Sequence, residues 1–438
     1  MKNRIGYASL GCPKATVDSE KIITLLGKSG YQFVGDYAEA DLVIVYTCGF
    51  ISEAQQESFE VITEALNENG RIIVSGCLGA KEELIKEQFP QVLGITGPND
   101  PNGVLRLVQQ HLPLASIPEA GIVLPPQGLK LTPSHYSYLK ISEGCNHNCS
   151  FCVIPQFRGR LISEKPETIL AEAERLVESG VNEIIVVSQD TGAYGSDLKG
   201  YVGDWRGAKA AADIAALAER LSELPVWIRI HYLYPYPHID KLVELMAEGK
   251  ILPYLDVPFQ HADSEILKHM KRPASGEDNL QRIAGWRSIC PDITIRSTFI
   301  VGFPGETEDQ FEQLLEFIYE ADMDRAGCFA YSPVDGADAN NLPDQIDEDE
   351  KQERVERFMN LQESISREKL RCKVGQQLEV IVDDVVDGQL VGRSYADAPE
   401  IDGLVYVKNS NGHINCGEII KVTVTDSSEH DLWGAPVI

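Results

Sequence analysis

Long apolar runs are missing from this sequence. No segment approaches the ~18 consecutive apolar residues that a membrane-spanning helix needs. The opening stretch, MKNRIGYASLGCPK, has no apolar core of the kind that marks a secretory signal. Internal repeats and low-complexity tracts are missing too. These absences argue against a membrane or secreted protein, and we expect a cytoplasmic one with no membrane partner.

Basic residues are scarce relative to acidic ones. The 438 residues include 39 Lys and Arg against 67 Asp and Glu, a net charge of −28. Such a surface repels phosphate backbones and anionic lipid and attracts basic proteins. With 43% apolar and 24% charged residues the composition is that of a globular protein, not a disordered or coiled-coil chain. At roughly 150 residues per domain, we expect about three domains.

Residues 1–112 alternate strand and helix patterns, which predicts a doubly wound α/β domain with a parallel sheet. The expected strands are 5–10, 41–46 and 71–75, and the expected helices are 19–30, 53–70 and 80–89. Residues 113–135 are rich in proline and lose periodicity, so we expect a linker there.

The alternation returns on a larger scale over residues 136–371. Six expected strands cover 138–142, 183–188, 226–232, 254–258, 294–301 and 327–331. Six βα units predict a partial (β/α)6 barrel, whose functional loops lie at the carboxyl ends of the strands. Residues 372–438 carry short alternating strands instead, at 378–382, 390–393, 404–407 and 419–424, which predicts a small β-barrel.

Six of the ten cysteines fall into two groups of three. The first group is Cys145, Cys149 and Cys152, in a CxxxCxxC spacing just after the first strand of the central domain. Three thiolates in one loop suit a four-iron cluster with one iron left open. The alternative is a zinc loop, which usually needs a fourth ligand at CxxC spacing, and His147 is awkwardly placed for that role.

This loop resembles the mark of the radical S-adenosylmethionine (SAM) superfamily, because an aromatic residue, Phe151, directly precedes the third cysteine. The resemblance implies that the open iron chelates SAM and that one-electron reduction releases a 5′-deoxyadenosyl radical. An external electron donor is then required. The cofactor performs this chemistry, and the protein positions the cofactor and the substrate and excludes water from the site.

The second group is Cys12, Cys48 and Cys77, each directly after an apolar strand of the first domain. The carboxyl ends of neighbouring parallel strands face one crevice, so the three thiols can meet there. Three isolated buried cysteines are the alternative.

With one set of three cysteines in each of two α/β domains, the chain resembles the methylthiotransferases. The resemblance implies a second, auxiliary 4Fe–4S cluster that holds the transferred sulfur, SAM as both radical source and methyl donor, and a final TRAM domain for substrate recognition.

Polar and glycine residues within or directly after the later barrel strands are candidate SAM contacts. They are Gln189, Asp190, Arg229, Gln260, Gly302 and Glu306. The alternatives are a capping turn for Asp190 and outward exposure for Arg229. Tyr194, Tyr232 and Tyr234 are candidate substrate contacts, and the alternative for the last two is a packed loop cover.

Two sister branches of this family modify either transfer RNA or a ribosomal protein. Residues 373–438 hold four basic and eleven acidic residues, a net charge of −7, which argues against transfer RNA and suits a basic protein. Asp397, Glu400 and Asp402 follow one another closely in a loop, and we expect them to face outward toward that partner. Motifs at 190–195, 234–237 and 393–403 also resemble the ribosomal-protein branch.

The resemblance implies methylthiolation of the β-carbon of an aspartate on small-subunit ribosomal protein twelve. Two alternatives stay open at this point: a transfer RNA methylthiotransferase, and a non-catalytic iron–sulfur electron-transfer protein. The acidic residues of the final domain also admit a plainer reading, in which they keep a small barrel soluble.

Overall fold

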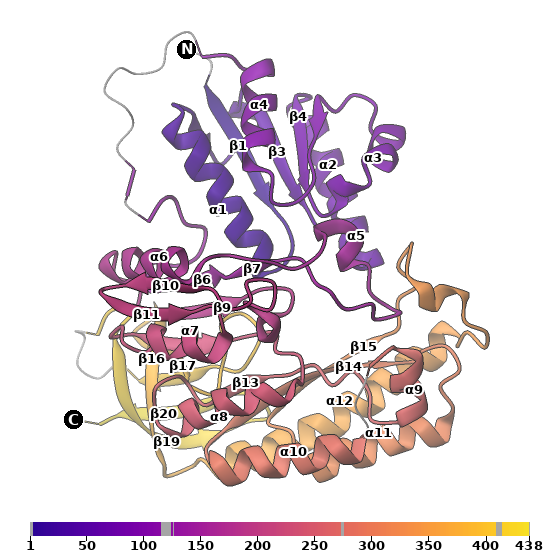
Figure 1. Ribbon diagram of the computed structural model, residues 1–438, viewed down its shortest axis with the longest axis vertical. Coiled ribbons are helices and arrows are strands. Elements are labelled where there is room, and N and C mark those ends of the chain that lie inside the picture. The colour runs from indigo at the N-terminus through magenta and orange to yellow at the C-terminus, as the bar shows by residue number, and fades with distance from the viewer. Residues whose placement is uncertain (1–2, 115–123, 126, 273–275, 409–413, 438) are drawn as a thin grey trace.

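The structure is a computed structural model that describes residues 3–114, 124–125, 127–272, 276–408 and 414–437. Three large β-sheets, besides two two-stranded ones, follow one another along the described chain, from the indigo N-terminal unit to the yellow C-terminal barrel in Figure 1. In the part of the chain that is described, no helix is long and apolar enough to cross a membrane. Of the predicted linker 113–135, residues 115–123 and 126 lie outside the described residues.

The N-terminal unit is a five-stranded parallel sheet in the order β2-β1-β3-β4-β5. Its strands are β1 (Arg4–Ser9), β2 (Gln32–Val34), β3 (Leu42–Thr47), β4 (Ile72–Gly76) and β5 (Gly94–Ile95). Its helices are α1 (Pro13–Lys28), α2 (Ser52–Glu68), α3 (Glu82–Gln88) and α4 (Pro101–His111), with 3₁₀ turns η1 (Tyr37–Glu39) and η2 (Leu78–Ala80).

Both faces of this sheet are covered. Helices α1 and α4 share one apolar core with the sheet, while α2 and α3 share another on the opposite face. Every residue of β3, Leu42–Thr47, is therefore buried, as expected for a central strand in a doubly wound domain. The predicted fold is confirmed. The short edge strands β2 and β5 and the helix α4 were not predicted.

The central unit is an open six-stranded parallel sheet in the order β6-β9-β12-β13-β14-β15. Its strands are β6 (Tyr136–Lys140), β9 (Glu183–Val187), β12 (Trp227–Ile230), β13 (Tyr254–Asp256), β14 (Thr294–Val301) and β15 (Arg325–Ala330). Because β6 and β15 do not pair within the described chain, this is the partial (β/α)6 barrel that the sequence predicts.

Helices cover the outside of the partial barrel. They are α6 (Pro166–Glu178), α7 (Ile214–Leu221), α8 (Asp240–Ala247), α9 (Ser264–His269), α10 (Gly276–Ile289), α11 (Glu308–Ala321) and the long α12 (Glu348–Arg371). The smaller elements are β7 (Ser142–Glu143), β8 (Ile162–Ser163), α5 (Ile154–Arg158), the hairpin β10 (Val202–Trp205) and β11 (Ala208–Ala211), and the 3₁₀ turns η3 (Thr191–Ala193), η4 (Pro237–Ile239) and η5 (Asp338–Asn341).

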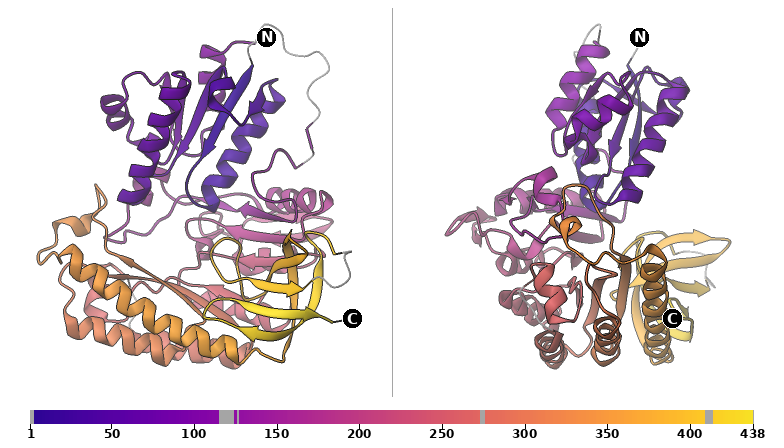
Figure 2. Two further views of the ribbon diagram at one scale, coloured as in Figure 1. Left: turned by 180° about the vertical axis from the view of Figure 1, so that it is seen from behind. Right: turned by 90° about the vertical axis from the view of Figure 1, so that its right-hand side faces the viewer.

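Side chains alternate between the two faces of the barrel strands. Ile184 and Ile228 belong to the core beneath the helices, whereas Glu183 and Arg229 lie on the opposite, concave side. The two other units meet the central one along β6, which α1 contacts, and along α12, which contacts β19 of the C-terminal barrel. Figure 2 shows this arrangement from behind and from the side.

The C-terminal unit is a closed barrel in the order β16-β17-β18-β20-β19. Its strands are β16 (Gln377–Val386), β17 (Gln389–Ser394), β18 (Val405–Lys408), β19 (Ile419–Ser427) and β20 (Leu432–Pro436). The small barrel is confirmed, but β20 was not predicted, because its sequence LWGAP contains Gly and Pro and shows little alternation.

A fully buried ion-pair chain ties this barrel to the concave face of the central sheet. The Glu183 carboxylate lies 2.7 Å from Arg229 Nε and 2.7 Å from Arg393 Nη1, and the side chains of all three are at most 1% exposed. Arg393 also binds Asp383 at 2.8 Å. The two guanidiniums hold the pKa of Glu183 below its usual value although burial alone would raise it.

We expect Glu183→Gln to lower the free energy of unfolding by about 3–5 kcal/mol, because it leaves two buried guanidiniums without their shared carboxylate. Urea denaturation of the full chain measures this change. Glu178→Gln, at an exposed position of α6, is the matched control and should change the stability by less than about 0.5 kcal/mol. Equal effects of the two substitutions would contradict the assignment.

Candidate functional site

The thiols of Cys12, Cys48 and Cys77 lie at the same carboxyl edge of the N-terminal sheet and interact electrostatically, and that they ligate one cluster stays a prediction. They follow β1, β3 and β4, which are neighbours in that sheet. Cys77 donates its backbone N–H to the carbonyl of Thr47, next to Cys48, at 3.0 Å. Gly11 has φ +111°, and a Cβ placed there would lie 3.5 Å from the Cys48 sulfur. Glycine therefore keeps open the space beside two of the thiols, which suits a bound group.

The three thiols differ in acidity. Burial would raise the pKa of Cys12, but Lys14 and the backbone N–H of Ala15 hold it below the usual value. Burial raises the pKa of Cys48 and raises the pKa of Cys77 to about 11, the latter in spite of the nearby Arg158 guanidinium. Metal binding must therefore displace protons from at least two of these thiols.

Buried charges join this cysteine group to the radical-SAM loop. Asp18 of α1, 2% exposed, pairs with Lys140 at the end of β6 and with Arg158 Nη1 of α5 at 3.0 Å. Glu143 binds the same two cations, at 2.7 Å and 2.9 Å. The Nη2 atom of Arg158 is buried without a hydrogen-bond partner in the described chain. Arg158 nevertheless acts on Cys77, because its charge and a side-chain hydrogen bond both lower the pKa of that thiol.

The CxxxCxxC loop lies between β7 and α5. Cys145 donates its N–H to the carbonyl of Gly159 at 3.1 Å, and Cys152 donates to the carbonyl of Cys149 at 3.1 Å. Burial raises the pKa of Cys145 to about 11 and that of Cys152 to about 12. Arg272 Nη1 lies 3.9 Å from the Cys149 sulfur, so a cation faces the thiols.

His147 is engaged elsewhere than with the thiols. Its ring stacks on Tyr234 at 3.9 Å, and its Nε2 atom lies 2.9 Å from Asp190 Oδ2 and 2.6 Å from Tyr236 Oη. These contacts disfavour the zinc-loop alternative. In the described residues, no three Cys, His, Asp or Glu side chains converge on the position of a single metal ion.

Two of the predicted SAM contacts lie at this loop. Gln189 Oε1 accepts the N–H of Gly144 at 2.8 Å, which leaves its buried Nε2 without a partner in the described chain. Asp190 accepts from Tyr236 Oη at 2.7 Å and caps the η3 turn through the N–H of Ala193. Phe151 packs against the cluster that contains Phe303. Their contact with SAM stays a prediction.

The loops after β13 and β14 place the remaining rim candidates. Gln260 has φ +73° and is held by backbone hydrogen bonds to Thr298 and Ile300. Gly302 has φ +68°, and a Cβ there would lie 2.3 Å from Lys351 of α12, so no larger residue fits. A SAM contact of either residue stays a prediction.

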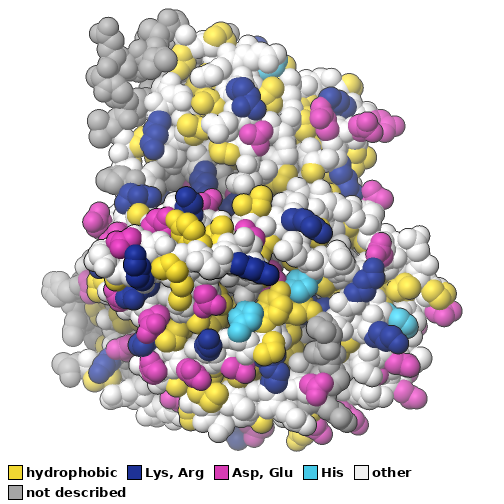
Figure 3. All heavy atoms as spheres, viewed as in Figure 1, with side chains coloured by type: hydrophobic (Ala, Val, Ile, Leu, Met, Phe, Trp, Pro, Cys, Tyr) yellow, Lys and Arg dark blue, Asp and Glu magenta, His cyan; other side chains and the backbone are white. Residues whose placement is uncertain are grey.

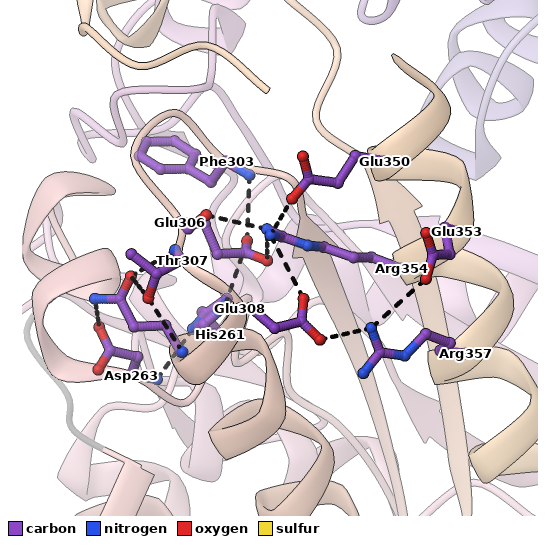
Figure 4. A network of polar contacts seen from close by, with 11 residues as sticks. His261, Asp263, Phe303, Glu306, Thr307, Glu308, Glu350, Glu353, Arg354 and Arg357 are labelled. Atoms are coloured by element: carbon purple, nitrogen blue, oxygen red, sulfur yellow. Dashed lines mark hydrogen bonds and ion pairs between the residues drawn. The ribbon is translucent and has the colours of Figure 1, made fainter. Parts of the chain in front are cut away.

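Three predicted ligand contacts are instead structural. Arg229 is bound by Glu183 and by the carbonyl of Tyr395 at 2.7 Å, so it meets a carboxylate of its own chain, not that of SAM. Glu306 is fully buried between Arg354 Nη1 at 2.8 Å and His261 at 3.6 Å (Figure 4). Tyr194 is 3% exposed, and its hydroxyl donates to the carbonyl of Glu164, which removes it from any substrate.

The acidic loop of the C-terminal barrel does not face outward as predicted. Asp397 binds Arg325 Nη2 at 2.6 Å, and Asp402 lies 3.6 Å from Arg296 Nε and accepts from Tyr254 at 2.6 Å. Both side chains are 3% exposed. Only Glu400 is exposed, and it accepts from the Tyr136 hydroxyl at 2.9 Å. The loop holds the barrel on the central sheet, because residues of strands β6, β13, β14 and β15 are its partners.

We expect Asp397→Asn to destabilise the full chain by about 3 kcal/mol or more, because it leaves the buried Arg325 guanidinium without its carboxylate. Asp402→Asn should cost less, about 1–3 kcal/mol, because Arg296 keeps its ion pair with Asp256 at 3.1 Å. Glu400→Gln is the control and should cost about 1 kcal/mol or less. Urea denaturation compares the three. Unchanged stability with slower binding of a basic protein would restore the outward-facing prediction.

The tyrosines after β12 connect the two cysteine groups. Tyr232 has the left-handed φ of +61°, and its N–H donates to Asp256 Oδ2 at 2.9 Å. The Nζ atom of Lys14, two residues after Cys12, lies 3.3 Å from the centre of its ring. Tyr234 stacks on His147 between Cys145 and Cys149, and Arg272 lies 4.1 Å above its ring.

The charged residues of this site were not among the predicted site residues. Lys14 and Arg158 lie within a few residues of a cysteine, which was a usable signal. Arg272 is far from every cysteine in the sequence and gave none. On the face shown in Figure 3, acidic and basic side chains are interspersed rather than gathered in a patch of one sign.

Three segments match described families: residues 4–97 match the uncharacterized protein family UPF0004, residues 139–318 the radical SAM superfamily, and residues 374–437 the TRAM domain. A solved radical SAM methyltransferase, TsrM from Kitasatospora setae with tryptophan and a SAM analogue bound, has a similar fold. Its TM-score is 0.54 at 16% identity, over 76% of this chain and 75% of that one. The three matched segments together define the class as a radical SAM protein with an N-terminal UPF0004 unit and a C-terminal TRAM domain.

Relatives that match over the full length identify the family within the radical SAM proteins. Two proteins named ribosomal protein uS12 methylthiotransferase RimO are similar to this chain. The one from Pectobacterium atrosepticum is 56% identical over 99% of this chain and 98% of its own. The one from Nitrosomonas eutropha is 56% identical over 98% and 96%. The chain belongs to the RimO family of radical SAM methylthiotransferases, and the predicted family resemblance is confirmed.

Proposed function

We propose that this protein adds a methylthio group to the β-carbon of one aspartate of ribosomal protein uS12. Full-length identity of 56% to relatives of that name supports the reaction and the substrate. One structural observation supports the proposal most directly: there are two sets of three cysteines. They are linked through the Asp18–Arg158 ion pair and the Lys14–Tyr232 contact. A protein with a single electron-transfer cluster does not need a second set of three cysteines linked to the first set.

The donor chemistry fits two 4Fe–4S clusters, one on Cys145, Cys149 and Cys152 and one on Cys12, Cys48 and Cys77, since each group offers three thiols and leaves one coordination place open. When bound, the first cluster with SAM supplies the 5′-deoxyadenosyl radical, the auxiliary cluster supplies sulfur, and a second SAM supplies the methyl group. An external electron donor completes the requirements.

The residues around the clusters have separate tasks. Arg158 and Arg272 bring positive charge to the two thiol groups and favour their thiolate forms. The free Nε2 of Gln189 donates a hydrogen bond to an acceptor of SAM at the rim of the barrel. The C-terminal barrel closes the concave side of the central sheet through Arg229, Glu183 and Arg393 and so excludes water.

The chain works as three units in this proposal, divided as the sequence predicts: 1–112, 136–371 and 372–438, with 113–135 as a linker. One sheet system for each unit supports the division. The net charge of −28 supports a basic protein substrate over transfer RNA. A ribosomal-protein substrate supports a cytoplasmic place of action.

We expect anaerobic reconstitution to load about eight irons per chain. Replacing Cys145, Cys149 and Cys152 by Ala should remove half of the iron and abolish 5′-deoxyadenosine formation. Replacing Cys12, Cys48 and Cys77 by Ala should remove the other half and abolish methylthio transfer while SAM cleavage persists. Iron analysis and chromatography of the products measure both effects.

Cys372→Ala, at an exposed position outside both groups, is the control and should leave iron and products unchanged. Normal methylthio transfer by the Cys12, Cys48 and Cys77 variant would disprove the sulfur-carrying role of that group.

We expect mass spectrometry to find the methylthio group on uS12 and not on transfer RNA when both are offered to the loaded enzyme. The acidic surface adds electrostatic attraction for the basic protein, so the binding of uS12 should weaken as salt rises from 0.05 to ~0.5 M. Modified transfer RNA, with uS12 unmodified, would favour the transfer RNA methylthiotransferase instead.

A further inference from the structure

A lysine without a carboxylate partner stands at the junction of the two cysteine groups. Among the described residues, the contacts of the Lys14 ammonium are with Tyr232 and, electrostatically, with Cys12 and Arg158. Asp18, the acid nearest to it along α1, is taken by Lys140 and Arg158. In a chain with 67 acidic residues, no described carboxylate balances this half-buried ammonium, whose charge is met through Cys12 and Tyr232, so it can still bind an incoming carboxylate.

The local backbone adds to the positive potential. Lys14 lies in the first turn of α1, which begins at Pro13 and extends over 16 residues. That turn contains no acidic side chain, and Cys12 provides no side-chain cap. The N–H groups at the start of such a helix and its dipole favour an anion at this end. The charge of Lys14 and the dipole of α1 therefore both favour an anion near the N-terminus of this helix.

The Lys14 ammonium is positioned by Tyr232, a residue of the central unit with an unusual backbone conformation. The ring of Tyr232 supports the ammonium at 3.3 Å, within the range of a cation–π contact. Tyr232 keeps its left-handed backbone because Asp256 accepts its N–H. Such a conformation costs about 1–3 kcal/mol in a non-glycine residue and persists where the surroundings impose it. The strained turn thus presents the ammonium in one place.

The Lys14 ammonium lies between the two sets of three cysteines. Lys14 is two residues from Cys12, and it rests on Tyr232. Two residues further on, Tyr234 stacks on His147 of the CxxxCxxC loop. Two residues of extended chain span at most about 7 Å. A substrate carbon that must reach both the radical source and the auxiliary cluster passes close to Lys14.

We propose that Lys14 binds the side-chain carboxylate of the aspartate to be modified and so selects aspartate and positions its β-carbon. This inference rests on the proposed function. The β-carbon is bonded directly to the carboxylate carbon, so a salt bridge to Lys14 fixes the reacting carbon one bond away. An uncharged asparagine of the same shape gains no such ion pair.

The competing role for Lys14 is to balance the charge of the auxiliary cluster through Cys12. The two roles separate in experiment. A charge-balancing lysine affects iron content and the absorption spectrum and treats all substrates alike. A carboxylate-binding lysine leaves the cluster intact and affects only substrates that carry the carboxylate.

The test measures equilibrium binding of two uS12 peptides to the cluster-loaded full chain without reductant, one with the target aspartate and one with asparagine in its place. We expect the native chain to prefer the aspartate peptide by about 10- to 100-fold, as for a charge-assisted hydrogen bond. Lys14→Met should reduce this preference to within about twofold, with iron content and absorption spectrum unchanged. Lys14→Arg should keep part of it.

Lys28→Met, at an exposed position in the last turn of the same helix, is the matched control and should keep the full preference. Retention of the preference in Lys14→Met, or loss of iron with equal weakening of both peptides, would overturn the inference. Failure of the native enzyme to methylthiolate uS12 in a separate mass-spectrometric assay would instead overturn the proposed function. The two failures are therefore distinguishable.

Discussion

The ion pairs of Asp18 fix how the N-terminal unit sits on the central one. This carboxylate leaves α1, the helix that starts at Cys12, and binds Lys140 at the end of β6 and Arg158 just after the CxxxCxxC loop. Tyr46 of β3 donates to the same carboxylate at 2.8 Å. One buried acid therefore connects elements that carry both cysteine groups. If it were lost, Lys140 and Arg158 would share the single carboxylate of Glu143, and the ion pairs that link α1 to the central unit would be missing.

The C-terminal barrel depends on the same kind of contact at the other end of the concave face. Glu183, Asp397 and Asp402 each pair with guanidiniums across the boundary between the units. Buried ion pairs add little net stability compared with apolar contacts, but they are intolerant of misplacement, since a shifted partner leaves a charge unpaired. They are therefore suited to fixing the orientation of the barrel. This explains why a loop that reads as an acidic docking surface is largely buried.

Local patterns in the sequence carried most of the fold. The central strands β3 and β4 are nearly continuous apolar runs, so these strands and their positions before Cys48 and Cys77 could be predicted from the sequence. The barrel strands contain more polar residues, and their regular alternation with helical segments was the signal. Edge strands of two or three residues, such as β2 and β5, lack that signal. The errors at Arg229, Glu306 and Asp397 have one cause. A charged residue at a loop or strand end looks the same in sequence whether it meets a ligand or a distant residue of its own chain, and only tertiary structure decides.

The distribution of charge in the site follows from what it must hold. The chain is strongly acidic, yet Lys14, Arg158 and Arg272 lie around the six thiols. Thiolates are anionic, and so is the carboxylate of an aspartate substrate, so an acidic centre would oppose both. Arg158 already has two carboxylate partners, and Arg272 donates to the carbonyl of Pro258 at 2.6 Å and faces Cys149. Lys14 differs from both because its described contacts include no oxygen of a carboxylate or a carbonyl. Its hydrogen-bonding capacity toward such oxygens is therefore left for an incoming anion.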